Sequence, residues 1–164
     1  MAEGCARLVV GANPARTLVR VVVLVACGAW LVTYGILPVR GSGPSMLPTI
    51  QDGQLMIVGR LSFRLRQPRR GELVAVRLED DRAVLIKRII ASPGDRMSIT
   101  RGLVSVNEVE VEEPYVSLRH PWHIAEFVLA PDEYFVIGDN RGMPMEMHTM
   151  GRVAKDRLIG PVLW

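Results

Sequence analysis

One long apolar stretch stands near the start of the chain, and only short apolar runs follow it. No charged residue occurs between Arg20 and Arg40, and a helix needs about 20 apolar residues to cross a bilayer. Residues 21–39 therefore predict a transmembrane helix, with Pro38 at its far end. The stretch has no polar face, which disfavours a buried helix of a soluble core. A cleavable leader has a shorter apolar region of about 7–15 residues, so the length favours an uncleaved anchor.

Short apolar runs separated by turn residues make up the rest of the chain. Asn107-Glu108 joins two valine-rich runs and predicts a hairpin turn. The expected strands are Leu55–Val58, Glu72–Arg77, Ala83–Ile90, Met97–Ile99, Leu103–Val106, Val109–Val111, Glu126–Leu129 and Tyr134–Ile137. This pattern predicts a mainly β fold, an antiparallel sheet or partly open barrel, with little helix beyond the N-terminal one.

Charges beside the apolar stretch predict its orientation. Arg7, Arg16 and Arg20 precede it, opposed only by Glu3, and basic residues beside a span stay in the cytoplasm. We therefore expect a single-pass protein of the cell membrane with a cytoplasmic N-terminus. The expected parts are a short cytoplasmic segment (1–20), a transmembrane helix (21–39) and an extracytoplasmic β domain (40–164).

Composition narrows the chemistry of the 164-residue chain, whose net charge is +3. Its two cysteines, Cys5 and Cys27, both precede the β domain, which therefore has no disulfide and no reactive thiol. The three histidines lie in loop-like sequence, and we expect no metal because zinc takes three or four protein ligands. The arginines between Asp52 and Glu72 predict either a solvated loop or a contact with anionic lipid headgroups. Only one aromatic residue stands among them, so nucleic acid is not an expected partner.

Ser45 and Lys87 are the candidate reactive pair. A lysine can serve as the base for a serine hydroxyl when burial lowers the lysine pKa by penalising the charged form. If residues 84–90 form a strand, Leu85, Lys87 and Ile89 share one face, and aliphatic side chains flank the amine. The alternatives are an ordinary loop serine and a lysine that reaches solvent from a sheet edge.

Four motifs resemble those of the bacterial type I signal peptidases, membrane-bound serine–lysine enzymes that remove leader peptides from exported proteins. They follow the family's order along the chain: Ser45–Thr49, Gly71–Val76, Ile86–Asp95 and Val136–Arg141. The resemblance implies Ser45 as nucleophile, its backbone N–H as an oxyanion donor, and Lys87 as general base. It also implies that four residues support the active site: Gly138, Asp139, Asn140 and Arg141.

The resemblance further implies that the substrates are preproteins bearing signal peptides, cleaved after small residues, and that no cofactor is required. Met46, Ile50, Leu85 and Ile86 match positions that line the family's substrate pockets, and core packing is their alternative role. The expected partners are these preproteins and the lipid bilayer, and we expect a monomer.

Several positions depart from the family's pattern. Pro144 stands where the family has a serine hydroxyl that orients the lysine, so Thr149 or a water is left to supply that contact. Glu146 and His148 replace an aspartate and an arginine that normally pair. Gly43 stands where some members carry a hydroxyl as the second oxyanion donor.

Other functions therefore stay open. A catalytically impaired or specialised relative would act as a membrane-anchored peptide-binding module. A triad of Ser45, Asp139 and His148 is another possibility, although the chain lacks the closing glycine of a nucleophile elbow. A self-cleaving cytosolic repressor also uses serine and lysine, but it would need a DNA-binding module, which the sequence does not show.

Overall fold

The computed structural model describes residues 13–78 and 83–164. Glu3, Cys5 and Arg7, which entered the predictions above, lie outside these residues. The chain divides into two compact units, Met1–Ile36 and Leu37–Trp164.

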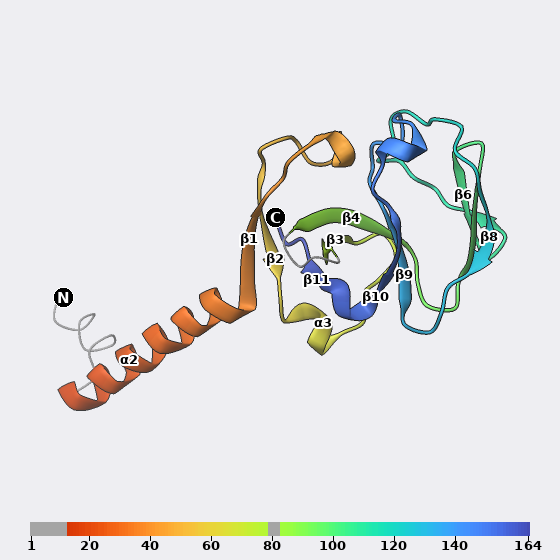
Figure 1. The fold of residues 1–164 in the computed structure, drawn as a ribbon. Helices are drawn as coiled ribbons and strands as arrows, with labels where there is room; N and C mark the ends of the chain where they lie inside the picture. Colours follow the sequence, from red (N-terminus) through yellow and green to blue (C-terminus); the bar gives the residue numbers. More distant parts are fainter. Residues whose placement is uncertain (1–12, 79–82) are drawn as a thin grey trace, which may run out of the picture. The chain divides into compact units, whose positions relative to one another are not determined.

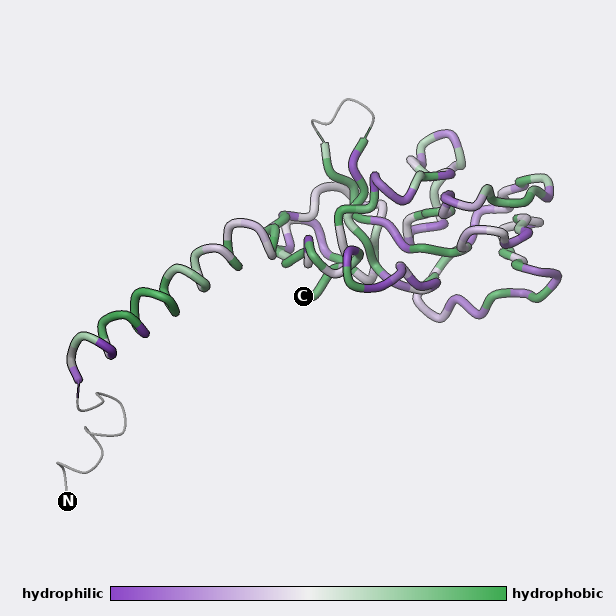
Figure 2. Tube along the Cα trace, turned by 90° about the horizontal axis from the view of Figure 1, so that it is seen from below, coloured by the Kyte–Doolittle hydropathy of each residue, from purple (hydrophilic) through white to green (hydrophobic). Residues whose placement is uncertain are grey.

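Apolar side chains cover the helix of the N-terminal unit. α2 (Pro14–Trp30) begins after Asn13, whose side-chain oxygen accepts a hydrogen bond from the Ala15 N–H at 3.1 Å, as expected of an N-cap. A π-helical turn, η1 (Leu31–Gly35), continues it. The 21 residues Ala15–Gly35 include an 18-residue stretch with a mean hydropathy of 1.9, and they are long and apolar enough to cross a membrane. Figure 2 shows this apolar character along the helix.

The helix begins and ends earlier than the predicted range 21–39. It ends at Gly35, and the next residues form the strand β1 (Ile36–Arg40). The prediction that Pro38 ends the helix was wrong because Leu37 and Val39 pack against the core of the second unit instead. Pro38 has no N–H to donate, which a strand at a sheet edge tolerates. The assignment of the three parts to cytoplasm, membrane and exterior stays a prediction.

Antiparallel strands form three sheets in the C-terminal unit (Figure 1). A two-stranded sheet pairs β1 with β2, a five-stranded sheet has the order β10-β9-β4-β3-β11, and a four-stranded sheet has the order β7-β6-β5-β8. The strands are β2 (Leu55–Gly59), β3 (Leu73–Arg77), β4 (Val84–Ala91), β5 (Arg96–Thr100), β6 (Leu103–Val106), β7 (Val109–Glu110), β8 (Ile124–Val128), β9 (Glu133–Ile137), β10 (Gly151–Ala154) and β11 (Leu158–Pro161). The mainly β prediction is confirmed, and the described strands form open sheets, not a closed barrel.

β4 is the central strand of the five-stranded sheet. It lies between β3 and β9, and each of the three buried apolar clusters contains one of its isoleucines: Ile86, Ile89 or Ile90. A polar side chain that points inward from this strand is therefore surrounded by protein and removed from solvent.

The sequence predicted eight strands, and each occurs within a few residues of its expected place. Asn107 and Glu108 form the predicted turn between β6 and β7, with φ values of 54° and 67°, and two such values are what a tight two-residue hairpin requires. The prediction missed β10 and β11 because both are short and interrupted by glycine or proline. β11 forms by pairing with β3, which lies far away in the sequence, and β10 forms by pairing with β9, the strand before it.

The arginine-rich stretch contains a short helix, α3 (Ser62–Leu65). Two arginines that follow this helix form ion pairs, Arg66 with Glu72 at 2.8 Å and Arg70 with Asp95 at 3.0 Å. These pairs neutralise part of the charge, and a contact with anionic lipid stays a prediction.

Candidate active site

Ser45 lies on a short 3-10 turn, η2 (Pro44–Met46). Gly43 precedes the turn with a φ of 89°, a backbone conformation that glycine adopts without steric cost. The Gly43 N–H donates to the Asp52 carboxylate at 2.9 Å, and the Ile50 N–H donates to the Met46 carbonyl at 3.0 Å. These bonds fix the backbone on both sides of the serine.

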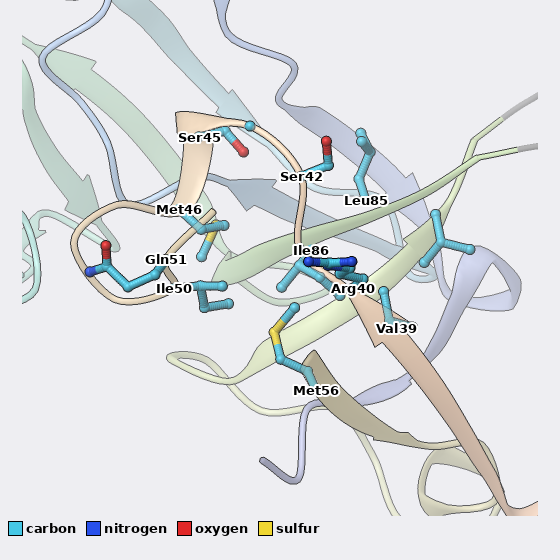
Figure 3. A pocket seen from close by; sticks show the side chains of 13 residues that line it. Val39, Arg40, Ser42, Ser45, Met46, Ile50, Gln51, Met56, Leu85 and Ile86 are labelled. Atoms are coloured by element: carbon cyan, nitrogen blue, oxygen red, sulfur yellow. The ribbon is translucent and has the colours of Figure 1, made fainter. Parts of the chain in front are cut away.

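A pocket of about 290 Å³ lies beside Ser45 (Figure 3). Its lining includes all four residues that the resemblance implied for substrate binding, Met46, Ile50, Leu85 and Ile86. Met46, Ile50 and Ile86 also belong to one buried apolar cluster, so they pack the core and line the pocket at once. The pocket is near the small end of the usual range for ligand sites.

Lys87 lies on β4 and exposes only 2% of its surface. Burial lowers its pKa from 10.5 to about 8, and the negative charge of Asp139 partly opposes that shift. Within residues 13–78 and 83–164 the amine has no ion-pair partner. The lysine therefore does not reach solvent from a sheet edge, which was the alternative.

Gly138 connects Lys87 with Ser45. Arg88 pairs with Ile137 in the register of β4 and β9, and the next antiparallel position sets Lys87 opposite Gly138. A Cβ atom on Gly138 would collide with the carbonyl oxygen of Ser45. Only a glycine lets the serine turn approach the sheet this closely, so Gly138 places the turn over the strand pair that carries the lysine.

Asn140 holds the serine turn from the same side. Its backbone N–H donates to the Ser45 carbonyl at 3.1 Å, and its side-chain amide donates to the Pro44 carbonyl at 3.1 Å. Two of the predicted support residues, Gly138 and Asn140, thus contact the backbone of the candidate nucleophile directly.

Asp139 is fully buried and joins the serine loop to β4. Arg88 Nε and Nη2 donate to its two carboxylate oxygens at 2.9 Å and 2.6 Å, and the Thr49 hydroxyl donates to it at 2.5 Å. The Arg88 guanidinium also lies 3.8 Å from the centre of the Tyr115 ring, where a cation and an aromatic face attract each other. Sequence reasoning missed the roles of Thr49, Arg88 and Tyr115, although Arg88 follows the lysine directly.

Arg141 forms the second buried ion pair. Its Nη2 donates to Glu113 at 2.5 Å, and its Nε donates to the Gly138 carbonyl at 2.7 Å. Glu113 was not predicted, and no local signal marks it, because the two partners are 28 positions apart. The pair fixes the chain as it leaves Gly138.

His148 lies against Gly138 on the same side as the Ser45 carbonyl. Its Cε1 and Nε2 atoms are 2.7 Å and 2.8 Å from the place where a Gly138 Cβ would stand. Its two ring nitrogens are buried and form no hydrogen bond with any described residue. Because Asp139 binds Arg88 and Thr49 instead, the Ser45–Asp139–His148 triad is not formed. Pro144 precedes the turn η3 (Met145–Met147) that leads to this histidine.

The arrangement defines a chemical class. A serine on a fixed turn beside a pocket, and a buried lysine of lowered pKa on β4, are the two kinds of group that a serine–lysine hydrolase needs. An apolar helix of membrane-spanning length precedes them. Among the described residues, no group of three or more His, Cys, Asp and Glu side chains is placed to hold a metal ion.

Comparison with known proteins identifies the family. The model of the family "Signal peptidase, peptidase S26" matches residues 15–164, and the chain belongs to this family. A probable signal peptidase I-2 of Synechocystis is 34% identical over 122 residues, which are 71% of this chain and 56% of that protein. The signal peptidase I T of Bacillus subtilis is 28% identical, over 75% of this chain and 69% of that protein.

Another relative is a thylakoidal processing peptidase 1 of Arabidopsis thaliana, which is 28% identical over 71% of this chain and 37% of that protein. A crystal structure of a signal peptidase I from Enterococcus faecalis covers 60% of this chain with 23% identity and a TM-score of 0.47. The chain thus spans little more than half the length of the Synechocystis relative.

Proposed function

We propose that this chain is a membrane-anchored serine endopeptidase that removes signal peptides from exported preproteins with a dyad of Ser45 and Lys87. The observation that carries the proposal is the burial of Lys87 and its lowered pKa. It is 2% exposed and has a pKa of about 8, and it lies opposite the glycine that touches the Ser45 backbone. The names of the relatives support the reaction, and membership of the family supports the peptidase class.

The lowered pKa matters because only the neutral amine can accept a proton. With a pKa of about 8, roughly one tenth of the lysine is neutral at pH 7, against roughly one part in 3,000 for an ordinary lysine. Burial therefore raises the concentration of the active base by more than two orders of magnitude.

The reaction proceeds through an acyl-enzyme. Lys87 Nζ takes the proton of Ser45 Oγ as that oxygen attacks the scissile carbonyl, and the backbone N–H of Ser45 stabilises the oxyanion. The ammonium then gives its proton to the leaving amine as the C–N bond breaks. Lys87 next accepts a proton from the water that hydrolyses the acyl-serine. The buried pair of Asp139 and Arg88 keeps the serine loop fixed on β4.

The substrate is an extended segment with small side chains before the cleaved bond. It lies along the pocket lined by Met46, Ile50, Leu85 and Ile86, since an extended chain presents alternate side chains to a wall of this kind. The helix Ala15–Gly35 anchors a monomer in the bilayer, with a cytoplasmic N-terminus and residues 40–164 outside. Membrane anchoring keeps the site at the surface where the apolar segment of a signal peptide is also held.

Cleavage of a synthetic signal-peptide substrate by the full chain in liposomes tests the proposal. Product masses identify the bond that is cut. Ser45→Ala and Lys87→Ala each reduce the rate by at least about 10³-fold, because neither group of a dyad works alone. The matched controls, Ser98→Ala on β5 and Lys155→Ala on η4 (Lys155–Arg157), retain the wild-type rate.

Two other outcomes would reject the dyad. Peptide binding without cleavage by any form would identify a membrane-anchored peptide-binding module, the role that Pro144 in place of a hydroxyl favours. Cleavage that survives Lys87→Ala would assign the base to another residue.

A further inference from the structure

His148 is a buried imidazole that has no hydrogen-bond partner among the described residues. Only 7% of it is exposed, and both ring nitrogens are unbonded, whereas buried polar groups are nearly always hydrogen-bonded. The edge-on ring of Trp122, 5.1 Å away between ring centres, fixes its orientation. Such a residue has a polar atom available for a partner that forms during the reaction.

The Nε2 atom lies beside the glycine that the Ser45 backbone contacts. The Ser45 carbonyl is on the same side of Gly138 as the imidazole. In the register of β4 and β9, Lys87 is opposite Gly138. Burial, followed by the positive charges of Lys87 and Arg141, lowers the pKa of His148 from 6.5 to about 4, and the nearby backbone of Thr149 and Asn140 only partly opposes that shift. The imidazole is therefore neutral near pH 7. The Arg141 guanidinium forms an ion pair with Glu113.

We propose that His148 is a positioning residue for Lys87: its Nε2 accepts a hydrogen bond from the ammonium that forms when Ser45 gives up its proton. This inference depends on the proposed function. It requires the tautomer that carries its proton on Nδ1, because only an unprotonated Nε2 can accept. Pro144 has no side-chain acceptor, so the histidine supplies the contact that the serine of the family pattern would otherwise make.

The chemistry favours a neutral acceptor here. The ammonium has three donors in a buried site, and unpaired donors there are costly. A carboxylate in this position would bind the ammonium strongly and keep the lysine charged, which would remove the base. An imidazole accepts a hydrogen bond without a charge of its own, and thus orients the amine while leaving its pKa low enough for catalysis.

Four variants test the proposal: His148→Leu, His148→Gln, His148→Asn and the exposed control His123→Ala. The Gln oxygen reaches the position of Nε2, whereas the Asn oxygen reaches only that of Nδ1. We expect His148→Leu to lower kcat by about 10- to 100-fold, the usual value of a hydrogen bond to a charged group, with little change in KM. His148→Gln restores most of kcat, His148→Asn does not, and His123→Ala equals wild type.

A second readout does not depend on activity. The chain has only two lysines, Lys87 and Lys155, so NMR of ¹³C-labelled lysine follows each amine, and Lys155→Arg assigns the signals. His148→Leu keeps the site buried but removes the acceptor, so it lowers the pKa of Lys87 by about one unit. Equal kcat for Gln, Asn and Leu, or an unchanged Lys87 titration in His148→Leu, would overturn the proposal. A wild type that does not cleave while its Lys87 titration responds to His148→Leu would reject the peptidase function and keep the contact.

Discussion

Two adjacent cationic residues on β4, Lys87 and Arg88, meet opposite conditions. Arg88 has both oxygens of a buried carboxylate, a backbone carbonyl and an aromatic ring as partners. Lys87 is more deeply buried than Arg88, yet its amine has no anion within ion-pair distance in the described chain. The same strand thus holds one cation that stays charged and one that readily becomes neutral.

The difference shows how the sheet separates structure from reactivity. Successive residues of a strand point to opposite faces, so Asp139 can neutralise Arg88 on one face and remain only a weak influence on Lys87. Desolvation without a partner lowers the pKa of an amine, whereas a paired cation keeps its proton. The proposed base depends on Arg88 taking the carboxylate that would otherwise stabilise the lysine charge.

The largest expected effect comes from exchanging the two cations. Lys87→Arg places a guanidinium in the site, and because this group is not deprotonated in proteins, cleavage falls by at least about 10³-fold. Arg88→Lys is the matched control, since it keeps a positive charge beside Asp139 and leaves the base in place, so most of the activity remains. Rates on the same signal-peptide substrate measure both. A Lys87→Arg protein that is folded and active would refute the role of a neutral amine.

A large loss of stability is expected when the Asp139 carboxylate is replaced by an uncharged amide. Asp139→Asn leaves the Arg88 cation largely buried and unpaired, and loss of one partner of such a pair typically costs about 3–5 kcal/mol. Urea unfolding of the full chain in detergent measures the difference from wild type. The same variant lowers the pKa of Lys87 further, because Asp139 is the charge that raises it. A loss below about 1 kcal/mol would mean that the pair behaves as a surface ion pair.

The buried amine itself gives a pH-dependent stability. Its pKa is about 8 in the folded chain and 10.5 as the reference value, so between these values the unfolded chain holds a proton that the folded chain has lost. The free energy of unfolding therefore rises with pH across this window. Lys87→Met removes that slope and stabilises the fold at pH 7 by up to about 3 kcal/mol.

Unfolding curves at pH 7 and above pH 10.5 check this, and the advantage of Lys87→Met should disappear at the higher pH. Lys155→Met serves as the control. If wild type and Lys87→Met differed equally at both values, the charge on Lys87 would not be the cause.

The smallest effect is expected at an exposed ion pair in the four-stranded sheet. Arg96 and Glu126 are 2.8 Å apart, and about half of each side chain is exposed. Solvent screens such pairs, so Arg96→Ala should leave both the melting temperature and the cleavage rate unchanged within error. A clear loss here would show that ion pairing on this domain contributes independently of burial.

The predictions that succeeded concern features that depend on local sequence, and the one that failed concerns the environment of apolar side chains. Strand positions follow from short-range alternation and turn residues, so the eight predicted strands and the turn at Asn107 and Glu108 were accessible from sequence. The end of the membrane-length helix was not, because Leu37 and Val39 are apolar whether they face lipid or pack against a protein core. Hydropathy records only their transfer from water, which both environments provide.

The sequence by itself determined the mainly β fold, the apolar N-terminal helix and the candidates Ser45 and Lys87, since local patterns and short motifs specify these features. Only the tertiary structure decided what surrounds them. Thr49 and Asp139 are 90 positions apart, Arg141 and Glu113 are 28 positions apart, and the free nitrogen of His148 faces Gly138 only in the folded chain. Burial and electrostatic coupling depend on which distant residues become neighbours, and these two quantities set the pKa of the lysine.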